Sequence, residues 1–292
     1  MCASSSSARR RNDPVERLPA EAYRVLVANA LAEDVGSGDV TSALTIGADQ
    51  QARGIILAKS SVVLAGLDIA AETFRQCDPR ARFQPHHQDG DRCEPGTVVA
   101  EVAGLARALL TAERTALNFV QRLSGIATAT ASYVTVAAGR ITILDTRKTT
   151  PTLRALEKYA VRCGGGTNHR QRLDDGILIK DNHKRLAGGI GEVLRRVAGA
   201  SLPVEVEVET LEELDQALAA GVTRVLIDNF SLADQREAVE RCRGRAVVEV
   251  SGGVTLEQLP AIAATGAALV SIGALTHSVR AADLSFELEP TL

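Results

Sequence analysis

A repeated rhythm of strand and helix over the second half of the chain constrains the fold more than any other feature of the sequence. From about Ile141, short β-branched runs end in polar or glycine residues, and an amphipathic stretch follows each one. Such runs, roughly 20 to 35 residues apart with helices between them, are typical of βαβ units and a parallel sheet. Thr150 and Pro151 predict the N-cap and first turn of the helix after the first run. A succession of six such runs predicts an α/β barrel; they are 141–144, 177–179, 204–208, 225–227, 247–250 and 269–272.

Residues 15–139 have a different pattern, because they mix short strands and helices. A helix is expected over about 20–33, and a longer one over about 107–131 joins this part to the barrel. Arg114, Asn118 and Gln121 form a polar stripe on the long helix. The predicted organisation is a tail over 1–14, an N-terminal domain over 15–139, a barrel over 140–280 and a C-terminal segment over 281–292 that could return to the N-terminal domain. The Ser- and Arg-rich tail is expected to be disordered, with an organelle transit peptide as the alternative.

The segment 203–209 alternates valine with glutamate, which places the two residue types on opposite faces of a strand. In a barrel the valines would meet the outer helices, and Glu205, Glu207 and Glu209 would point inward. Inward carboxylates need cations, hydroxyls or a metal, because unpaired buried charge is costly. The alternative is an edge strand whose glutamate face is solvated. The segment alone leaves both interpretations open.

Polar side chains follow the predicted strands at the points where the strands end. In parallel barrels the active site is built from the carboxyl ends of the strands, so these residues are candidates for one site. Arginine binds planar carboxylates with two hydrogen bonds and lysine binds phosphate as a point charge, so the basic members predict a polyanionic substrate. The candidates are Arg147, Lys148, His169, Arg170, Lys180, Glu207, Asp228, Ser251, Gly252, Gly253 and Gly273.

Two subsets of these candidates suit a phosphorylated sugar. Ser251, Gly252, Gly253 and Gly273 follow the last two strands, where main-chain N–H groups commonly hold phosphate. Glu207 and Asp228 could bind ribose hydroxyls, or a Mg²⁺ ion held mainly by a pyrophosphate.

Composition and missing motifs exclude several classes of protein. The net charge of -3 gives no general basic field, so neither nucleic acid nor an anionic membrane is an expected partner. No apolar run approaches the roughly 18 residues that cross a bilayer. Neither a zinc spacing, a nucleophile elbow, a P-loop nor a dinucleotide fingerprint occurs in a suitable place. The five scattered cysteines favour a reduced cytoplasm.

Seven segments resemble the signature segments of the quinolinate phosphoribosyltransferase family, and they occur in the family's order. The resemblance extends over about residues 21–289, and the runs TRKT, GGGxNHR and LIKDNH are highly specific in combination. Thr152 stands where the family usually has glycine, and Arg172 and Asp174 replace smaller residues. The segments are 33–41, 113–118, 121–128, 145–149, 164–170, 178–183 and 273–276.

The resemblance implies an N-terminal α/β sandwich domain and an incomplete, seven-stranded α/β barrel, assembled as a homodimer or larger oligomer. It implies transfer of a phosphoribosyl group from phosphoribosyl pyrophosphate to quinolinate with loss of CO2, in NAD biosynthesis and with Mg²⁺ as cofactor. By family position, the quinolinate carboxylates would be bound by Arg147, His169, Arg170, Lys180 and, from the partner subunit, Arg114, and Lys148 would line the same pocket. Glu207 and Asp228 would bind the ribose, and the serine and glycines the 5-phosphate. The catalytic set would be Lys148, Lys180, Glu207 and Asp228.

Three other functions remain open at the level of sequence. A relative of the same fold could act on another aromatic acid or in molybdenum uptake, although Arg147, His169 and Arg170 favour a dicarboxylate. A Schiff-base aldolase could use Lys180 or Lys148. A non-catalytic anion-binding relative should lack some of these charges.

Overall fold

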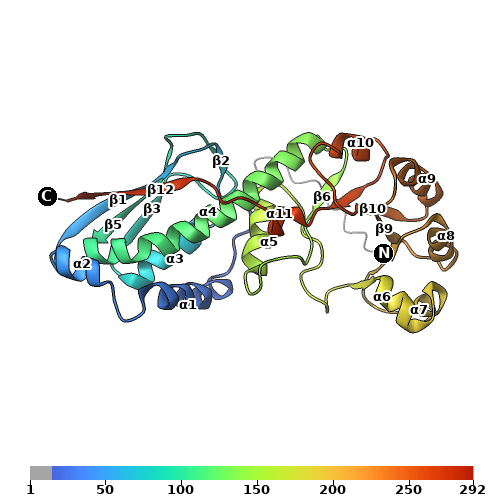
Figure 1. Cartoon of the computed structure of the whole chain (residues 1–292), viewed down its shortest axis with the longest axis horizontal. Coiled ribbons are helices and arrows are strands. Elements are labelled where there is room, and N and C mark those ends of the chain that lie inside the picture. The colour runs from blue at the N-terminus through green and yellow to red at the C-terminus, as the bar shows by residue number, and fades with distance from the viewer. Residues whose placement is uncertain (1–14, 292) are drawn as a thin grey trace. The chain divides into compact units, whose positions relative to one another are not determined.

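The computed structural model describes residues 15–291, so the predicted tail over 1–14 lies outside the described residues. The chain divides into two compact units, which are described separately (Figure 1). The first contains the residues up to Ala129, Ala155–Gly165 and the residues from Val279 onward, and the second contains Thr130–Arg154 and Gly166–Ser278. Within the described range, no helix is both long enough and apolar enough to cross a membrane.

The first unit is built on an antiparallel sheet with helices packed against it. The strand order is β12-β1-β5-β3, so the last strand of the chain pairs with the first. Helices α3 and α4 lie against the sheet (Figure 1), and residues from both join the sheet's apolar core. The elements are η1 Ala20–Ala22, α1 Arg24–Val35, α2 Val40–Thr45, β1 Gln51–Ala58, β2 Val62–Val63, α3 Leu67–Cys77, β3 Arg82–Pro85, β4 Arg92–Cys93, β5 Val98–Leu105, α4 Ala106–Ala137 and β12 Leu284–Pro290.

The packing of β12 against this sheet depends on one glycine. Gly54 of β1 pairs with Leu288, and a Cβ atom added to Gly54 would lie 2.2 Å from the ring of Phe286. The Phe286 ring packs against Phe74 of α3, with a centroid separation of 5.4 Å. Glycine at position 54 therefore makes room for the ring that ties the end of the chain to the core.

The second unit contains a six-stranded parallel sheet in the order β6-β11-β10-β9-β8-β7. All of its neighbouring strands are parallel, as the strand and helix rhythm predicts. A single parallel bridge joins Leu144 of β6 to Thr167, at the place of a seventh strand. The strands are β6 Thr142–Leu144, β7 Ile177–Ile179, β8 Val204–Val208, β9 Arg224–Asp228, β10 Val247–Ser251 and β11 Leu269–Ser271.

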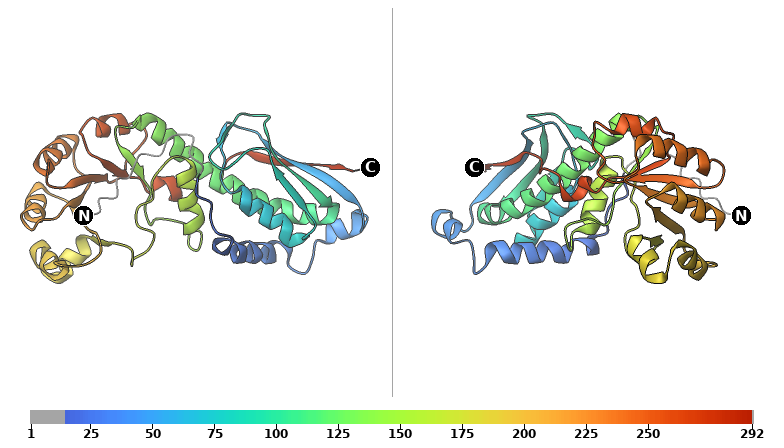
Figure 2. Two further views of the ribbon diagram at one scale, coloured as in Figure 1. Left: turned by 180° about the vertical axis from the view of Figure 1, so that it is seen from behind. Right: turned by 45° about the vertical axis from the view of Figure 1, so that its right-hand side comes forward.

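Helices cover the outer side of this parallel sheet, and α7 to α10 follow one another around it (Figures 1 and 2). Side-chain caps start two of them, since Thr210 accepts a hydrogen bond from the Glu213 N–H and Ser231 accepts one from the Asp234 N–H. The helices that follow strands of the second sheet are α5 Arg154–Cys163, α6 Asp181–Ala187, α7 Ile190–Val197, α8 Leu211–Ala219, α9 Leu232–Cys242, α10 Leu259–Ala263 and α11 Ala274–His277.

The predicted start of α5 at Thr150 and Pro151 is wrong. The helix begins at Arg154, because Thr152 has a φ of +69°, in the left-handed region that ends regular helical geometry. Thr152 is also the position at which the resembling family usually has glycine.

Candidate active site

The two central glutamates of β8 lie on the inner face of the parallel sheet and are buried. Strand β8 lies between β7 and β9, so it is not an edge strand. Val206 and Val208 are fully buried on the opposite face, whereas Glu205 and Glu207 remain only 5% and 8% exposed. Each glutamate meets a cation, and Glu209 after the strand is exposed. The inward interpretation of the alternating segment is therefore correct for Glu205 and Glu207 and wrong for Glu209, and the solvated edge strand is wrong.

Lys180 and Glu207 form an ion pair at the carboxyl ends of β7 and β8. The register pairs Ile179 with Val206, which brings the next residue of each strand level. The Lys180 Nζ atom is 2.5 Å from Glu207 Oε2. This contact argues against a Schiff-base role for Lys180, since such a lysine must offer its nitrogen to a substrate carbonyl, and here a carboxylate holds it.

The carboxyl ends of β9 and β10 bring Asp228 and Ser251 side by side, as their register shows. The Asn229 side chain donates a hydrogen bond to Asp228 Oδ2 at 2.7 Å, and the Asn229 main-chain N–H donates to the Ser251 carbonyl oxygen. Gly252 has a φ of +102°, and a Cβ atom there would lie 2.7 Å from the Asn229 nitrogen. Only glycine fits, so the main chain after β10 stays bare, as a turn that binds phosphate requires. Gly253 follows, with a φ of +56° and open space around it.

Lys148 lies beside Gly273 at the end of β11. The Thr276 hydroxyl donates to the Lys148 carbonyl oxygen at 2.7 Å, which fixes the Lys148 main chain to the start of α11. A Cβ atom on Gly273 would lie 3.2 Å from the Lys148 side chain. These contacts bring the loop after β6 against the end of β11, so Lys148 and Gly273 belong to one rim.

Arg147 and Arg170 are two partly buried guanidinium groups, and neither forms an ion pair among residues 15–291, although the charges of Asp175 and Glu205 act on Arg170 from a distance. The Nε atom of Arg147 is buried and, within the described chain, lacks any hydrogen-bond partner. Arg170 donates to the Gly176 carbonyl oxygen at 2.9 Å. Burial lowers the pKa of Arg170, and the nearby charge of Arg147 lowers it further. Buried polar groups are nearly always hydrogen-bonded, so the unpartnered Nε atom of Arg147, beside a second guanidinium, suits an anionic ligand.

His169 is held by the protein at both ring nitrogens. Its Nε2 lies 2.9 Å from Glu205 Oε2, and its Nδ1 accepts the Arg170 N–H at 2.7 Å. Asp145, fully buried after β6, accepts from the His169 N–H at 2.8 Å. His169 thus lies at the predicted rim, but its ring is bonded to protein groups.

The charged group behind His169 was not predicted as part of the site. Arg224 contacts both Glu205 and Glu249, and all three lie on the inner face of β8, β9 and β10. Ligand atoms of His169, Glu205 and Glu249 lie within 4.8 Å of one another, a spacing that could suit a metal. The Arg224 guanidinium already bonds both carboxylates, so the protein supplies the cation itself. Only Glu205 had a signal in the sequence, through the alternation of its strand.

Arg114 belongs to the first unit, on an exposed face of α4, whereas the other candidates belong to the second. Within one unit, therefore, the structure brings together every predicted site residue except Arg114.

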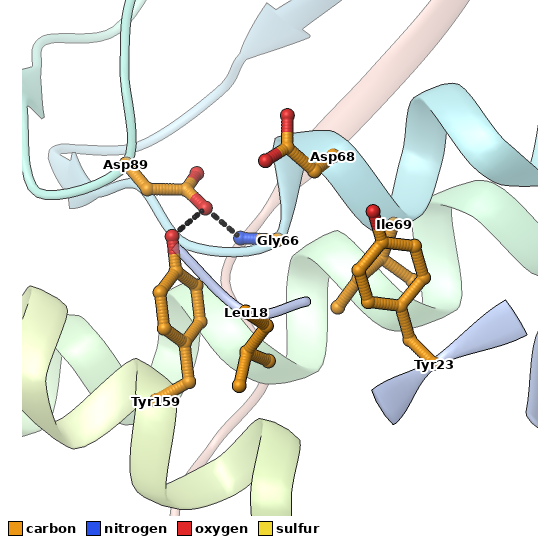
Figure 3. Close-up of a pocket in the computed structure, with 7 residues that line it drawn as sticks. All are labelled: Leu18, Tyr23, Gly66, Asp68, Ile69, Asp89 and Tyr159. Carbon is orange, nitrogen blue, oxygen red and sulfur yellow. Dashed lines mark hydrogen bonds between the residues drawn. The ribbon is translucent and has the colours of Figure 1, made fainter. Parts of the chain in front are cut away.

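A small pocket in the first unit has a structural explanation (Figure 3). Asp89 accepts hydrogen bonds from the Gly66 and Leu67 N–H groups at the start of α3, and from the Tyr159 hydroxyl at 2.7 Å. Burial raises the pKa of Asp89 despite these bonds. None of the predicted site residues lines the pocket, and its Asp89 caps the start of helix α3.

Two models of known families match the chain. The quinolinate phosphoribosyl transferase N-terminal domain matches residues 39–124, and the C-terminal domain of the same family matches residues 126–287. The chain belongs to the quinolinate phosphoribosyl transferase family.

Similar family members are known from several bacteria. A protein of Bacillus subtilis described as a probable nicotinate-nucleotide pyrophosphorylase [carboxylating] is 46% identical over 260 residues, covering 88% of this chain and 90% of that protein. The nicotinate-nucleotide pyrophosphorylase [carboxylating] of Mycobacterium leprae is 43% identical over 279 residues, covering 92% of this chain and 98% of that protein. The solved nicotinate-nucleotide pyrophosphorylase of Francisella tularensis has a TM-score of 0.90 at 40% identity, covering 95% of this chain and all of that one. The predicted combination of a sandwich domain with an α/β barrel is confirmed.

The donor set at the rim fits Mg²⁺ only as an ion held mostly by a substrate. Glu207 is already neutralised by Lys180, and Asp228 is hydrogen-bonded by Asn229. Mg²⁺ typically keeps few protein carboxylates when substrate phosphates complete its coordination. Glu207 and Asp228 could therefore assist a family member's metal without forming a cage for it.

Proposed function

We propose that this chain transfers the phosphoribosyl group of phosphoribosyl pyrophosphate to quinolinate and releases pyrophosphate and CO2, giving nicotinate mononucleotide for NAD biosynthesis. One observation carries the substrate class: the charge of Arg147 acts on the pKa of nearby Arg170, and neither guanidinium forms an ion pair with an acid of the described chain. A planar dicarboxylate can bond both guanidinium groups. Membership of the family narrows that dicarboxylate to quinolinate.

The carboxylates of quinolinate are bound in this proposal by Arg147 and Arg170, with Lys148 and Lys180 completing the positive field. Arginine is suited to this role because its planar fork matches a carboxylate with two hydrogen bonds. His169 is the remaining predicted contact. In the free protein the His169 ring is hydrogen-bonded to Glu205 and to the Arg170 main chain. His169 therefore contributes to quinolinate binding by holding Arg170 in place.

The phosphoribosyl group occupies the ends of β8 to β11. Glu207 and Asp228 accept hydrogen bonds from ribose hydroxyls, and the turns at Ser251, Gly252, Gly253 and Gly273 offer N–H groups to the 5-phosphate. When bound with the pyrophosphate, Mg²⁺ neutralises the charge of the leaving group. Lys180 can move from Glu207 to the substrate without leaving an uncompensated carboxylate, because a ribose hydroxyl then donates to Glu207.

The reaction needs positioned charge and no covalent nucleophile. The pyridine nitrogen forms a bond to the anomeric carbon as the bond to pyrophosphate breaks, and the developing cationic carbon lies near Glu207 and Asp228. The quaternary nitrogen then stabilises the electron pair that remains on C2 when CO2 departs. A proton added to C2 completes the product. Holding the two substrates in contact supplies much of the acceleration.

A homodimer is part of this proposal, with Arg114 of the partner subunit completing the carboxylate site. Its support is the exposed position of Arg114 on α4 and the family resemblance. A cytoplasmic location is proposed because the four described cysteines, Cys77, Cys93, Cys163 and Cys242, form no disulfide bond with one another.

The deciding experiment measures ¹⁴CO2 released from quinolinate labelled in its 2-carboxylate. Release should require phosphoribosyl pyrophosphate and Mg²⁺, and unlabelled nicotinate should not substitute for quinolinate as an acceptor. A folded protein that releases nothing would favour the alternative of a related enzyme that acts on another aromatic acid. Borohydride trapping with substrate would separately expose a Schiff-base aldolase.

A further inference from the structure

Three charged residues, a partly buried arginine and two buried glutamates, form an array behind the rim. Arg224, the first residue of β9, donates from Nε to Glu205 Oε1 at 2.8 Å and from a terminal nitrogen to Glu249 Oε2 at 2.6 Å. Both carboxylates are buried, and the residues come from three adjacent strands. An arginine that bonds two carboxylates from neighbouring strands is geometrically fixed, since its fork is planar. Glu205, Arg224 and Glu249 are called the Arg224 array below.

The Arg224 array ends on His169. Glu205 gives one oxygen to Arg224 and the other to His169 Nε2, at 2.9 Å. The Arg170 N–H donates to Nδ1, so Nδ1 has no proton, and the proton of the neutral ring is on Nε2. This tautomer donates to Glu205 and accepts from Arg170. The ring therefore connects the array to the main chain of an arginine in the candidate carboxylate site.

We propose that Arg224 and Glu249 are positioning residues for quinolinate binding. They fix Glu205, Glu205 holds His169 in its neutral Nε2–H form, and His169 holds the Arg170 main chain in place. This inference rests on the proposed carboxylate site, because its functional effect is expected at Arg170.

The charge of the array shows why Arg224 is needed. Two carboxylates and one guanidinium leave a net charge of about -1 facing the ring, and Glu249 Oε1 is 3.6 Å from His169 Nε2. Burial raises the pKa of Glu249, and the charge of Glu205 raises it further. Burial also acts to raise the pKa of Glu205, but the hydrogen bond from His169 and the charge of Arg224 outweigh it and hold that pKa below its usual value.

Other charged groups also surround the ring. Asp145 bonds the His169 N–H from the end of β6, and Arg170 is the next residue, with the charge of Arg147 near it. Removing Arg224 would add one uncompensated negative charge to this surrounding. The ring should then take a proton on Nδ1, which would break the bond from the Arg170 N–H.

A set of charge variants in the full-length protein tests the proposal. Arg224→Met leaves two carboxylates facing the ring, whereas Arg224→Met combined with Glu249→Gln restores the parent's net charge. Ring ¹⁵N shifts of labelled histidine, assigned with His169→Gln, distinguish the neutral Nε2–H form from the charged ring. Glu213→Gln is the matched control, because it removes the buried Lys184 ion pair elsewhere in the same unit.

Near neutral pH, His169 should be the neutral Nε2–H form in the parent and charged in Arg224→Met. The KM for quinolinate should rise at least about tenfold in Arg224→Met, as expected when one charge-assisted hydrogen bond is misplaced, while that for phosphoribosyl pyrophosphate stays within about twofold. The double variant should recover the neutral ring and most of the quinolinate affinity. Glu213→Gln should change neither.

Several results would overturn the proposal. They are an uncharged His169 in Arg224→Met, a double variant no better than the single one, or equal increases in both KM values. Glu249→Gln alone retains the bond between Arg224 and Glu205, so it reports on the ring if Arg224→Met fails to fold; a charged ring in Glu249→Gln would contradict the charge argument. If the parent does not turn over quinolinate, the proposed function fails, and the ring spectra still decide whether the array controls His169.

Discussion

Arg147 offers a prediction in which stability and activity move in opposite directions. Its Nε atom is buried without a hydrogen-bond partner in the described chain, and an unsatisfied buried donor costs about 1–3 kcal/mol. Its charge also repels that of Arg170. Arg147→Met keeps an unbranched apolar stem and removes both costs. We expect the free energy of unfolding to rise by about 1 kcal/mol, the lower end of that range, because the stem of methionine fills the space incompletely.

The same substitution should abolish quinolinate turnover. Two charge-assisted hydrogen bonds to a carboxylate are each worth roughly 1.5–3 kcal/mol, so their loss lowers kcat/KM by about 10²- to 10⁴-fold. Urea unfolding followed by circular dichroism measures the first quantity, and labelled CO2 release measures the second. Arg172→Met, at an exposed arginine of the following loop, is the control and should alter stability by less than about 0.5 kcal/mol and activity by less than about twofold.

The reasoning fails if Arg147→Met loses stability, because Arg147 would then be a structural residue whose partner lies within the protein. It also fails if kcat/KM falls less than about tenfold. A variant that is more stable but does not turn over quinolinate would support the reasoning. It would show that Arg147 lowers the stability of the free protein because its charge is needed to bind the ligand.

Three further predictions concern the strained turns and the subunit contact. Thr152→Gly should raise the free energy of unfolding by about 0.5–1 kcal/mol in urea titrations, since a β-branched residue at a φ of +69° is strained, and Thr152→Ala, which keeps the Cβ atom, should gain less. Gly252→Ala should lose about 1–3 kcal/mol and raise the KM for phosphoribosyl pyrophosphate, because its Cβ would meet the Asn229 nitrogen; an unchanged protein would contradict the close approach. Mixing inactive Arg114→Ala with inactive Lys180→Ala protein should restore part of the activity through hybrid dimers, and no rescue after proven subunit exchange would contradict a shared site.

The spacing of residues along the chain was sufficient to predict which side chains share a face of a strand and which follow the ends of strands. The valine and glutamate alternation offered Glu205, Glu207 and Glu209 as inward carboxylates, because a period of two fixes which residues share a face. The first two lie inward, whereas Glu209 lies beyond the end of β8 and is exposed. The polar residues after each run predicted the rim, since parallel strands carry their carboxyl ends to one edge. Both arguments use only spacing along the chain, so they were available without the structure.

Features that depend on pairing across the sheet were not predicted. Arg224 is the first residue of β9 and Glu249 is the one charged residue of β10, and no spacing distinguishes them from surface residues. They become a group only because β8, β9 and β10 are neighbours in register. The start of α5 was missed for a different reason: capping residues predict where a helix can begin, but the left-handed Thr152 delays it to Arg154.

The cations of the second unit fall into two groups, those that neutralise acids of the protein and those that are left for a ligand. Arg224 bonds two carboxylates and Lys180 bonds Glu207, so these cations balance acids that the fold itself has buried. Arg147 and Arg170 form no such ion pair in the described chain; burial and the charge of Arg147 lower the pKa of Arg170, and the charges of Asp175 and Glu205 offset this only in part. A fold keeps such an arrangement only if an anion from outside completes it, since unpaired buried charge is otherwise costly. Two guanidinium groups without a bonded carboxylate suit a ligand that carries two, so a monocarboxylate such as nicotinate would leave one arginine without a bonded partner and bind more weakly than quinolinate.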